Sequence, residues 1–396
     1  MRALAVAAVV LAACGPQLKP ETLVDQLRVL SLTAEPPEIH PGDTTQVEVL
    51  ELDPSRPMQV TTVVWVGCDP DPFNLGRGAC NDTTALLQPT AFSTFPPGVR
   101  ILGFGPKAFY TPPADLFSVL EKDDPIRFNG TVGQILAVVI GEEVKPTSSD
   151  AELRELFTRI EKQEVQTVLA LTRVTVSEKA ALNKNPRLET LVVDGQPLPK
   201  GAQLLAAPGQ HLTLTLSAPA EDRETYEVRL PDGPQQRTES LVAAWYSSAG
   251  RFRDARIDLD THPDTTFIAP GGLEVPDDPL PPRRQATLWS VLRDSRGGQA
   301  WKQYPLFVCD ASLARPSVSM VVLPSSRDQA ISVKGTNLGS TADVVIGGVA
   351  LGRSVYRAAT DEFVGDWPDL PPGTYPVRLR GKDCSDADTG LSVTLP

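Results

Sequence analysis

Two stretches of the chain show the same order of hydrophobic and polar patterns. Each begins with a Pro-Gly turn and continues with an alternating segment, a tryptophan-bearing apolar segment, an aromatic-x-x-Pro step and a longer apolar run. The first copy occupies 41–43, 45–49, 63–66, 110–113 and 135–140, and the second occupies 208–210, 211–216, 242–246, 267–270 and 286–292. Alternation predicts half-buried strands, and short apolar runs between turns predict buried ones. We therefore expect two related all-β domains, over 27–178 and 179–312, whose loops differ in length.

A tryptophan lies in the third segment of each copy. Trp65 and Trp245 are both flanked by apolar residues. This arrangement resembles bacterial Ig-like domains, where a tryptophan on a central strand fills the space between two sheets. The alternative is a ligand-stacking role, but apolar neighbours favour packing in the core. The resemblance implies tandem Ig-like β-sandwiches.

One helix is expected within the first domain. Ser149-Asp150-Ala151-Glu152 has the pattern of a capping box, and apolar residues follow at helical spacing: Leu153, Leu156, Phe157 and Ile160. We predict an amphipathic helix over 150–162 that packs on the sandwich. A strand over 165–176 then ends the domain near Ser177.

The last part of the chain, 313–396, carries three different motifs. They are Gly335-Thr336-Asn337-Leu338-Gly339, a Val-x-Ile-Gly-Gly strand at 344–348, and Leu-Pro-Pro-Gly-x-Tyr at 370–375. In this order they resemble the IPT/TIG domain, an Ig-like module. We expect Gly335 and Gly339 to allow backbone angles that other residues resist, and Asn337 to bond its own turn. The family occurs in surface receptors, secreted enzymes and transcription factors, so the resemblance implies interaction and not chemistry.

The N-terminal residues predict export. Arg2 precedes an apolar run over 3–13 that is too short to span a bilayer but suits a signal peptide. Leu11-Ala12-Ala13-Cys14-Gly15 resembles the bacterial lipobox, which implies removal of 1–13 and lipid on Cys14, followed by a polar stem over 14–26. An ordinary secretory signal or a buried N-terminal strand is the alternative. Gly15 in place of aspartate favours the outer membrane, facing the periplasm or the cell exterior. The whole chain is similar to lipoproteins with Ig-like repeats that are common in predatory or gliding soil bacteria.

The cysteine count agrees with an oxidising compartment. Apart from Cys14, the chain holds Cys68, Cys80, Cys309 and Cys384. Cys68 and Cys80 bracket a loop rich in Pro, Gly and Asn, so we predict a local disulfide there and a second one that ties Cys309 to Cys384. A metal site is the alternative, but neither CxxC spacing nor a nearby histidine supports it.

Candidate chemistry is sparse. The net charge of −12 argues against a nucleic-acid partner, because such surfaces need basic patches. The chain has three histidines and none of the common hydrolase or phosphate-binding motifs, so we assign no catalytic residue and expect no cofactor. The Asp294–Gly298 segment is interpreted as a structural hairpin turn.

One acidic cluster could bind calcium. Its candidate ligands are Asp258, Asp260 and Asp264, with Asp254 and His262 nearby. The alternative is a solvated charged hairpin, since Arg251, Arg253 and Arg256 lie close enough to pair with these groups. Asp69, Asp71 and Asn74 form a second, weaker candidate.

Two classes of function remain open from the sequence. The first is a membrane-anchored, non-enzymatic binding or scaffold module with a protein or glycan partner. The second is an accessory subunit or secreted hydrolase that acts on glycan or protein with a dispersed site. Two carboxylates about 5–10 Å apart in a pocket would indicate the second class, whereas an exposed apolar patch would indicate the first.

Overall fold

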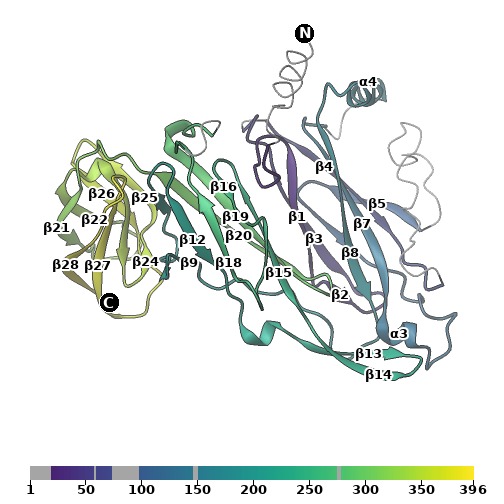
Figure 1. The fold of residues 1–396 in the computed structure, drawn as a ribbon. Coiled ribbons are helices and arrows are strands. Elements are labelled where there is room, and N and C mark those ends of the chain that lie inside the picture. The colour runs from purple at the N-terminus through teal and green to yellow at the C-terminus, as the bar shows by residue number, and fades with distance from the viewer. Residues whose placement is uncertain (1–18, 58, 74–97, 146–149, 274–277) are drawn as a thin grey trace, which may run out of the picture.

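A computed structural model describes residues 19–57, 59–73, 98–145, 150–273 and 278–396. These residues form β-sandwiches in a row, with the second between the other two (Figure 1). The all-β fold class is thereby confirmed. Each sandwich has its own buried apolar cluster, and the three clusters are centred on the residues of 27–176, 188–308 and 331–395. None of the helices in the described part of the chain is long and apolar enough to cross a membrane.

The first sandwich pairs a small sheet with a larger one. The small sheet has the order β1 (Arg28–Glu35), β3 (Thr45–Leu52), β6 (Lys107–Tyr110). The larger sheet has the order β2 (Glu38–Ile39), β8 (Thr167–Val176), β7 (Thr131–Ile140), β4 (Thr62–Cys68), β5 (Val99–Phe104). Trp65 on β4 is fully buried between them, and its indole N–H donates to the Gly105 carbonyl at 2.8 Å.

The second sandwich repeats this plan. One sheet has the order β10 (Gln196–Pro197), β9 (Val192–Val193), β12 (His211–Thr215), β18 (Asp264–Ile268), β16 (Arg251–Phe252). The other has the order β11 (Leu204–Ala206), β20 (Gln299–Val308), β19 (Gln285–Asp294), β15 (Leu241–Ser247), β17 (Arg256–Asp258). Trp245 on β15 is fully buried, as Trp65 is on β4.

The sheet topology supports the internal repeat seen in the sequence. In each copy the tryptophan strand pairs antiparallel with the apolar strand, β4 with β7 and β15 with β19. A short strand then pairs in parallel with the strand that follows, β2 with β8 and β11 with β20. Because the other strand pairs of these two sheets are antiparallel, a parallel pair at the same edge in both copies indicates a shared plan.

The third sandwich is made of two antiparallel sheets. Their orders are β21 (Ser317–Val322), β22 (Ile331–Thr336), β26 (Glu362–Asp366), β25 (Gly352–Arg357), and β24 (Val349–Ala350), β23 (Thr341–Ile346), β27 (Gly373–Gly381), β28 (Asp386–Leu395). The glycines of the first motif act differently from expectation. Neither Gly335 nor Gly339 has a positive φ; instead a Cβ on Gly335 would lie 1.8 Å from the Ser317 carbonyl oxygen. Asn337 takes the left-handed conformation and donates to Arg315, on another segment.

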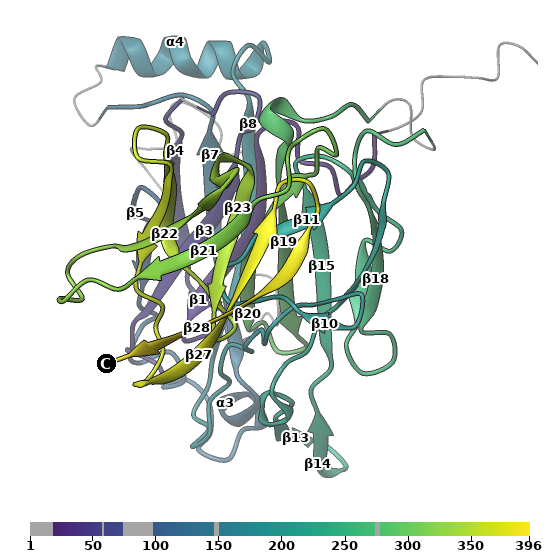
Figure 2. The same cartoon turned by 90° about the vertical axis from the view of Figure 1, so that its left-hand side faces the viewer.

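Helices are few among the described residues. The predicted helix is α4 (Asp150–Glu161), which lies across one end of the first sandwich (Figure 2). Leu156 and Ile160 pack there against Val64 and Ile140. A second, shorter helix, α3 (Pro125–Asn129), was not expected. Single 3-10 turns are η3 (Ala220–Asp222), η4 (Pro282–Arg284) and η5 (Leu338–Ser340).

A separate hairpin leaves the body of the second sandwich. It consists of β13 (Thr225–Leu230) and β14 (Gly233–Thr238), which pair only with each other. The hairpin extends beneath the first sandwich and reaches α3 (Figure 1). It therefore connects the two units at the end opposite α4.

Candidate functional site

The first and second sandwiches share an apolar interface. Its buried residues come from both units: Val24, Leu30 and Leu50 on one side, Trp289 and Val291 on the other. Strands β1 and β20 face each other across it. Burial of this kind favours one fixed arrangement of the two sandwiches, since separating them would expose apolar surface to water.

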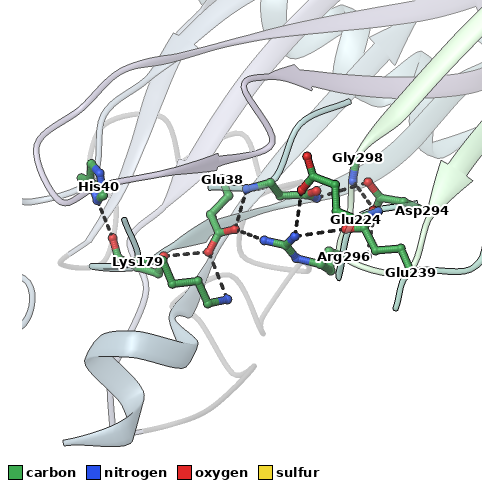
Figure 3. A network of polar contacts seen from close by, with 10 residues as sticks. Glu38, His40, Lys179, Glu224, Glu239, Asp294, Arg296 and Gly298 are labelled. Atoms are coloured by element: carbon green, nitrogen blue, oxygen red, sulfur yellow. Dashed lines mark hydrogen bonds and ion pairs between the residues drawn. The ribbon is translucent and has the colours of Figure 1, made fainter. Parts of the chain in front are cut away.

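A buried charge network lies at one end of this interface (Figure 3). Arg296, in the turn between β19 and β20, donates through Nη2 to Glu38 of β2 and through Nη1 to Glu239 at 3.1 Å and Glu224 at 3.2 Å. The side chains of Glu38 and Glu239 are each 1% exposed, and that of Arg296 is 9% exposed. Arg296 thus joins a carboxylate of the first sandwich to two of the second.

Glu38 has a full set of partners. Ser177 Oγ donates to it at 2.7 Å, the backbone N–H of Asn183 at 2.9 Å, and Lys179 Nζ lies 3.5 Å away. Burial alone would raise the pKa of Glu38, but the Ser177 hydrogen bond and the two cations together hold the pKa below its ordinary value. Glu38 therefore stays ionised and paired.

The pKa of Glu239 is shifted in the opposite direction. Burial, together with the nearby Asp294 charge, raises the pKa of Glu239 to about 7, although Arg296 acts in the other direction. Asp294 itself accepts from the backbone N–H groups of Arg296 and Gly298, which shapes the turn that presents the guanidinium. The network thus holds one carboxyl that changes charge near neutral pH.

The β13–β14 hairpin covers the network. Asn129 of α3 donates to the Arg229 carbonyl at 2.7 Å and accepts from the Arg229 N–H at 2.8 Å. The Arg229 guanidinium lies 3.7 Å from the centre of the Phe128 ring, and the Arg296 guanidinium lies 4.6 Å from that of Tyr226. These contacts are cation–π pairs. The Arg229–Phe128 contact fastens the hairpin to the first sandwich, and the Arg296–Tyr226 contact fastens it to the charge network.

A cleft lies elsewhere along the same interface. Its volume is about 420 Å³, and both sandwiches contribute to its walls: Glu51, Leu52, Asp53, Pro54, Arg56, Pro57, Gln59 and Thr61 from the first, and Ser248, Thr287 and Trp289 from the second. Most of the walls come from the end of β3 and the segment after it. Mixed apolar and polar walls of this size are typical of small-ligand sites.

Two polar atoms of the cleft residues have no hydrogen-bond partner among the described residues. They are the indole N–H of Trp289, which is buried, and Oε2 of Glu51. The other Glu51 oxygen accepts from the Thr61 hydroxyl, and burial raises the pKa of Glu51. Unpaired buried donors and acceptors are costly. Both atoms are closed off from solvent in this structure, so a ligand in the cleft would reach them only after the surrounding side chains had shifted.

The third sandwich is joined to the second by covalent and ionic contacts. The Cys309–Cys384 disulfide links the end of β20 to the β27–β28 connection, with Cα atoms 5.4 Å apart. Nearby, Arg380 donates to Asp343 at 3.0 Å and to the Gln203 carbonyl at 2.6 Å, and Asp343 accepts from the Gln203 N–H. Asp343 and Arg380 are buried. The third sandwich is thereby held to β11 and β20.

The remaining cysteines predicted as site residues are only partly described. Cys14 and Cys80 lie outside the described residues. Cys68 at the end of β4 is buried and disulfide-bonded. The pairing of Cys68 with Cys80 and the lipid on Cys14 therefore stay predictions.

The aspartates predicted to bind calcium are used otherwise. Asp258 accepts from the backbone N–H groups of Asp260 and Thr261, and Asp260 pairs with Arg223. Asp264 starts β18 with an exposed side chain. Within the described ranges, no group of three or more His, Cys, Asp or Glu side chains could hold a metal ion. Asp258 thus stabilises its own turn and Asp260 is paired with Arg223, and the calcium site stays a prediction.

Several site residues had no signal in the sequence. Glu38 and Glu239 lie far apart along the chain and meet only because the two sandwiches pack together. Arg296 was interpreted as part of an ordinary turn, and that turn does form. Its guanidinium, however, points into the interface. Nothing in the Asp-Ser-Arg-Gly-Gly pattern distinguishes a buried Arg296 from an exposed one.

Comparisons with known proteins leave the family open. No protein-family model matches the chain, and no curated protein matches it. One similar solved structure is Bacteroides ovatus SGBP-B, from a mixed-linkage glucan utilization locus, in complex with a mixed-linkage heptasaccharide. It is 11% identical to this chain with a TM-score of 0.16, and the match covers 93% of this chain and 69% of that one. A structure with a xylogluco-oligosaccharide is 11% identical with a TM-score of 0.18, over 93% and 59%. Three N-terminal domains of the bacteriophage RB49 outer capsid protein Hoc are 9% identical with a TM-score of 0.19, over 93% and 96%. The chain spans less than two thirds of the second structure. Scores this low carry no argument about function.

Proposed function

We propose that this chain is a non-enzymatic binding protein, anchored to the outer membrane through lipid on Cys14, that holds a neutral glycan in the cleft between its first two sandwiches. The observation that carries the proposal is the cleft itself, whose walls come from both sandwiches and combine the Trp289 ring and two prolines with polar side chains. A sugar has the same mixture of apolar ring faces and hydroxyl groups, which both accept and donate hydrogen bonds, so a hydroxyl-rich ligand suits these walls.

The charges in the cleft favour a neutral ligand. Asp53 is neutralised by Arg56, whose guanidinium lies 2.9 Å away. Glu51 has no such cation within the described part of the chain, and burial raises the pKa of its carboxyl. An anionic ligand would meet Glu51 and Asp53, and a strongly cationic ligand would have to displace Arg56. An uncharged polyol requires neither, and the prolines and Trp289 offer apolar surface to the faces of sugar rings.

The same geometry disfavours hydrolysis. Glycosidases of the usual kind need an acid and a nucleophile or base as two carboxylates flanking the bond. Both oxygens of Asp53 are occupied by its own loop, one by the Ser55 hydroxyl at 2.5 Å and one by Arg56. Glu51 is then left without a second free carboxylate among the lining residues. This supports binding over the hydrolase alternative.

Calorimetric titration of the mature chain with a panel of neutral oligosaccharides tests the proposal. We expect at least one to bind, and Glu51→Gln to weaken binding by roughly tenfold, since a hydrogen bond to a carboxylate contributes about 1.5–3 kcal/mol. The matched control is Glu48→Gln, on the same strand and paired with Lys107 away from the cleft. Binding equally affected by both variants would contradict the site, and release of shortened sugars would favour the hydrolase.

A further inference from the structure

The buried network contains more carboxylates than cations. The groups that face Glu239 come from every element around it: Arg296 and Asp294 from the β19–β20 hairpin, Glu224 from the segment before β13, and Glu38 and Lys179 across the interface. Glu38, Glu224, Glu239 and Asp294 thus share Arg296 and Lys179. Such an excess of buried negative charge is unfavourable unless a carboxyl takes up a proton.

Arg296 is the only bridge in this cluster between Glu38 of the first sandwich and Glu239 of the second, among the described contacts. When Glu239 is neutral, the guanidinium is left to Glu38 and Glu224. When Glu239 is ionised, it competes for the guanidinium and repels the neighbouring Asp294 and Glu224. The protonation state of Glu239 therefore alters the strength of the Arg296–Glu38 contact that joins the two sandwiches.

We propose that this network is a proton-operated clamp between the first two sandwiches. A proton on Glu239 favours the arrangement described above, in which the first sandwich is packed on the second (the seated form), and loss of that proton weakens the packing. The clamp goes beyond ligand binding and does not depend on it. The cleft shares the same interface and takes walls from both sandwiches, so the clamp would also control the shape of the cleft.

The direction of the effect follows from proton linkage. With the sandwiches packed, the pKa of Glu239 is about 7. Separation would admit water to the carboxyl and lower its pKa toward the ordinary 4.5, although Asp294, Glu224 and Arg296 of the same sandwich would stay beside it. Between these two pH values the seated form binds more protons than the separated form. The equilibrium constant for seating therefore falls as pH rises through this range and stays constant above about pH 7. One proton changes the seating equilibrium by at most about tenfold per pH unit. Glu38, whose pKa is lowered, loses its contribution only below its ordinary range.

Native-state hydrogen exchange of the mature chain tests the clamp. The Asn183 N–H donates to Glu38 and is released only when the network opens. After correction for the intrinsic rate, we expect its opening constant to rise severalfold per unit between pH 5 and 7 in the wild type and to stay level in Glu239→Gln. The matched control is Glu227→Gln on the outer hairpin, which should keep the wild-type slope.

His40 lies beside the network, with its ring nitrogen 2.9 Å from the Ser177 carbonyl oxygen. A slope that persists in Glu239→Gln would assign the effect to another group and overturn the proposal. If that variant does not fold, carbonyl carbon-13 NMR of the wild type replaces it: a glutamate carboxyl titrating near 7 supports the clamp, and all glutamates titrating near 4.5 refute it.

Discussion

The guanidinium of Arg296, at the tip of a hairpin in the second sandwich, donates to the carboxylate of Glu38 in the first. Both side chains are almost wholly buried. The first two sandwiches are therefore joined at two places. One is this charge pair, and the other is the apolar cluster that contains Leu30 and Trp289. A cleft between domains can keep a defined shape only if the domains are fixed in this way.

Loss of Arg296 should be costly. Arg296→Ala leaves Glu38 and Glu239 buried without their shared cation, so we expect the free energy of unfolding of the joined sandwiches to fall by about 3–5 kcal/mol. Urea denaturation, monitored by tryptophan fluorescence, measures this free energy of unfolding. Arg353→Ala removes a pair whose arginine is 90% exposed and should cost no more than about 1 kcal/mol. Equal losses in both variants would contradict a structural role for the network.

The two core tryptophans should respond differently to the same substitution. Both are fully buried, but the Trp65 N–H donates to the Gly105 carbonyl whereas the Trp245 N–H has no partner among the described residues. Trp65→Phe leaves the half-buried Gly105 carbonyl without this donor, while Trp245→Phe removes an unpaired donor. We expect Trp65→Phe to cost about 1–2 kcal/mol more in unfolding free energy. A larger loss for Trp245→Phe would show that packing, not hydrogen bonding, decides the difference.

The disulfide should matter mainly for the third sandwich. Cys309 and Cys384 are separated by 75 residues, and a loop of that length contributes about 4 kcal/mol in the chain-entropy model. Replacing both cysteines by serine should lower the thermal midpoint of the third sandwich and leave that of the first unchanged. Calorimetry resolves the two transitions. An unaltered profile would mean that the Asp343–Arg380 pair and apolar contacts suffice.

Lipid anchoring is tested at Cys14. Cys14→Ala should move the protein from the membrane fraction to the soluble fraction after cell lysis and centrifugation, because two or three acyl chains are what makes such an anchor durable. The matched control replaces Ser55, far along the chain in a loop, by alanine. A Cys14→Ala protein that stays in the membrane fraction would refute the anchor.

The sequence predicted the parts of the fold that depend on local pattern. Alternation and apolar runs located β4, β7, β12 and β15, the capping box located α4, and flanking residues placed Trp65 and Trp245 in the core. Hydrophobic periodicity reports which face of a strand is buried, so these features could be predicted from one chain. Helix α3 was missed because it is one short turn with no periodic signal.

What depends on contacts between sandwiches could not be predicted. Glu38, Glu239 and Arg296 look like ordinary surface residues, since each is flanked by turn residues or prolines. They are buried where the first two sandwiches meet, and no local pattern reports that contact. The same holds for Glu51 and Trp289, which belong to different sandwiches. The aspartates at 258, 260 and 264 show a further limit, because spacing alone does not tell a turn from a metal site, and the backbone hydrogen bonds of Asp258 appear only in the fold.

The indole resonance of Trp289 tests ligand binding in the cleft most directly. The chain has five tryptophans, whose indole N–H signals can be assigned by single Trp→Phe variants in nitrogen-15 NMR. On titration with a neutral oligosaccharide that binds, we expect the Trp289 signal to shift, the fully buried Trp65 and Trp245 signals to stay in place, and the sugar to be recovered intact. A saturating sugar that leaves Trp289 unmoved while shifting another indole would contradict the account.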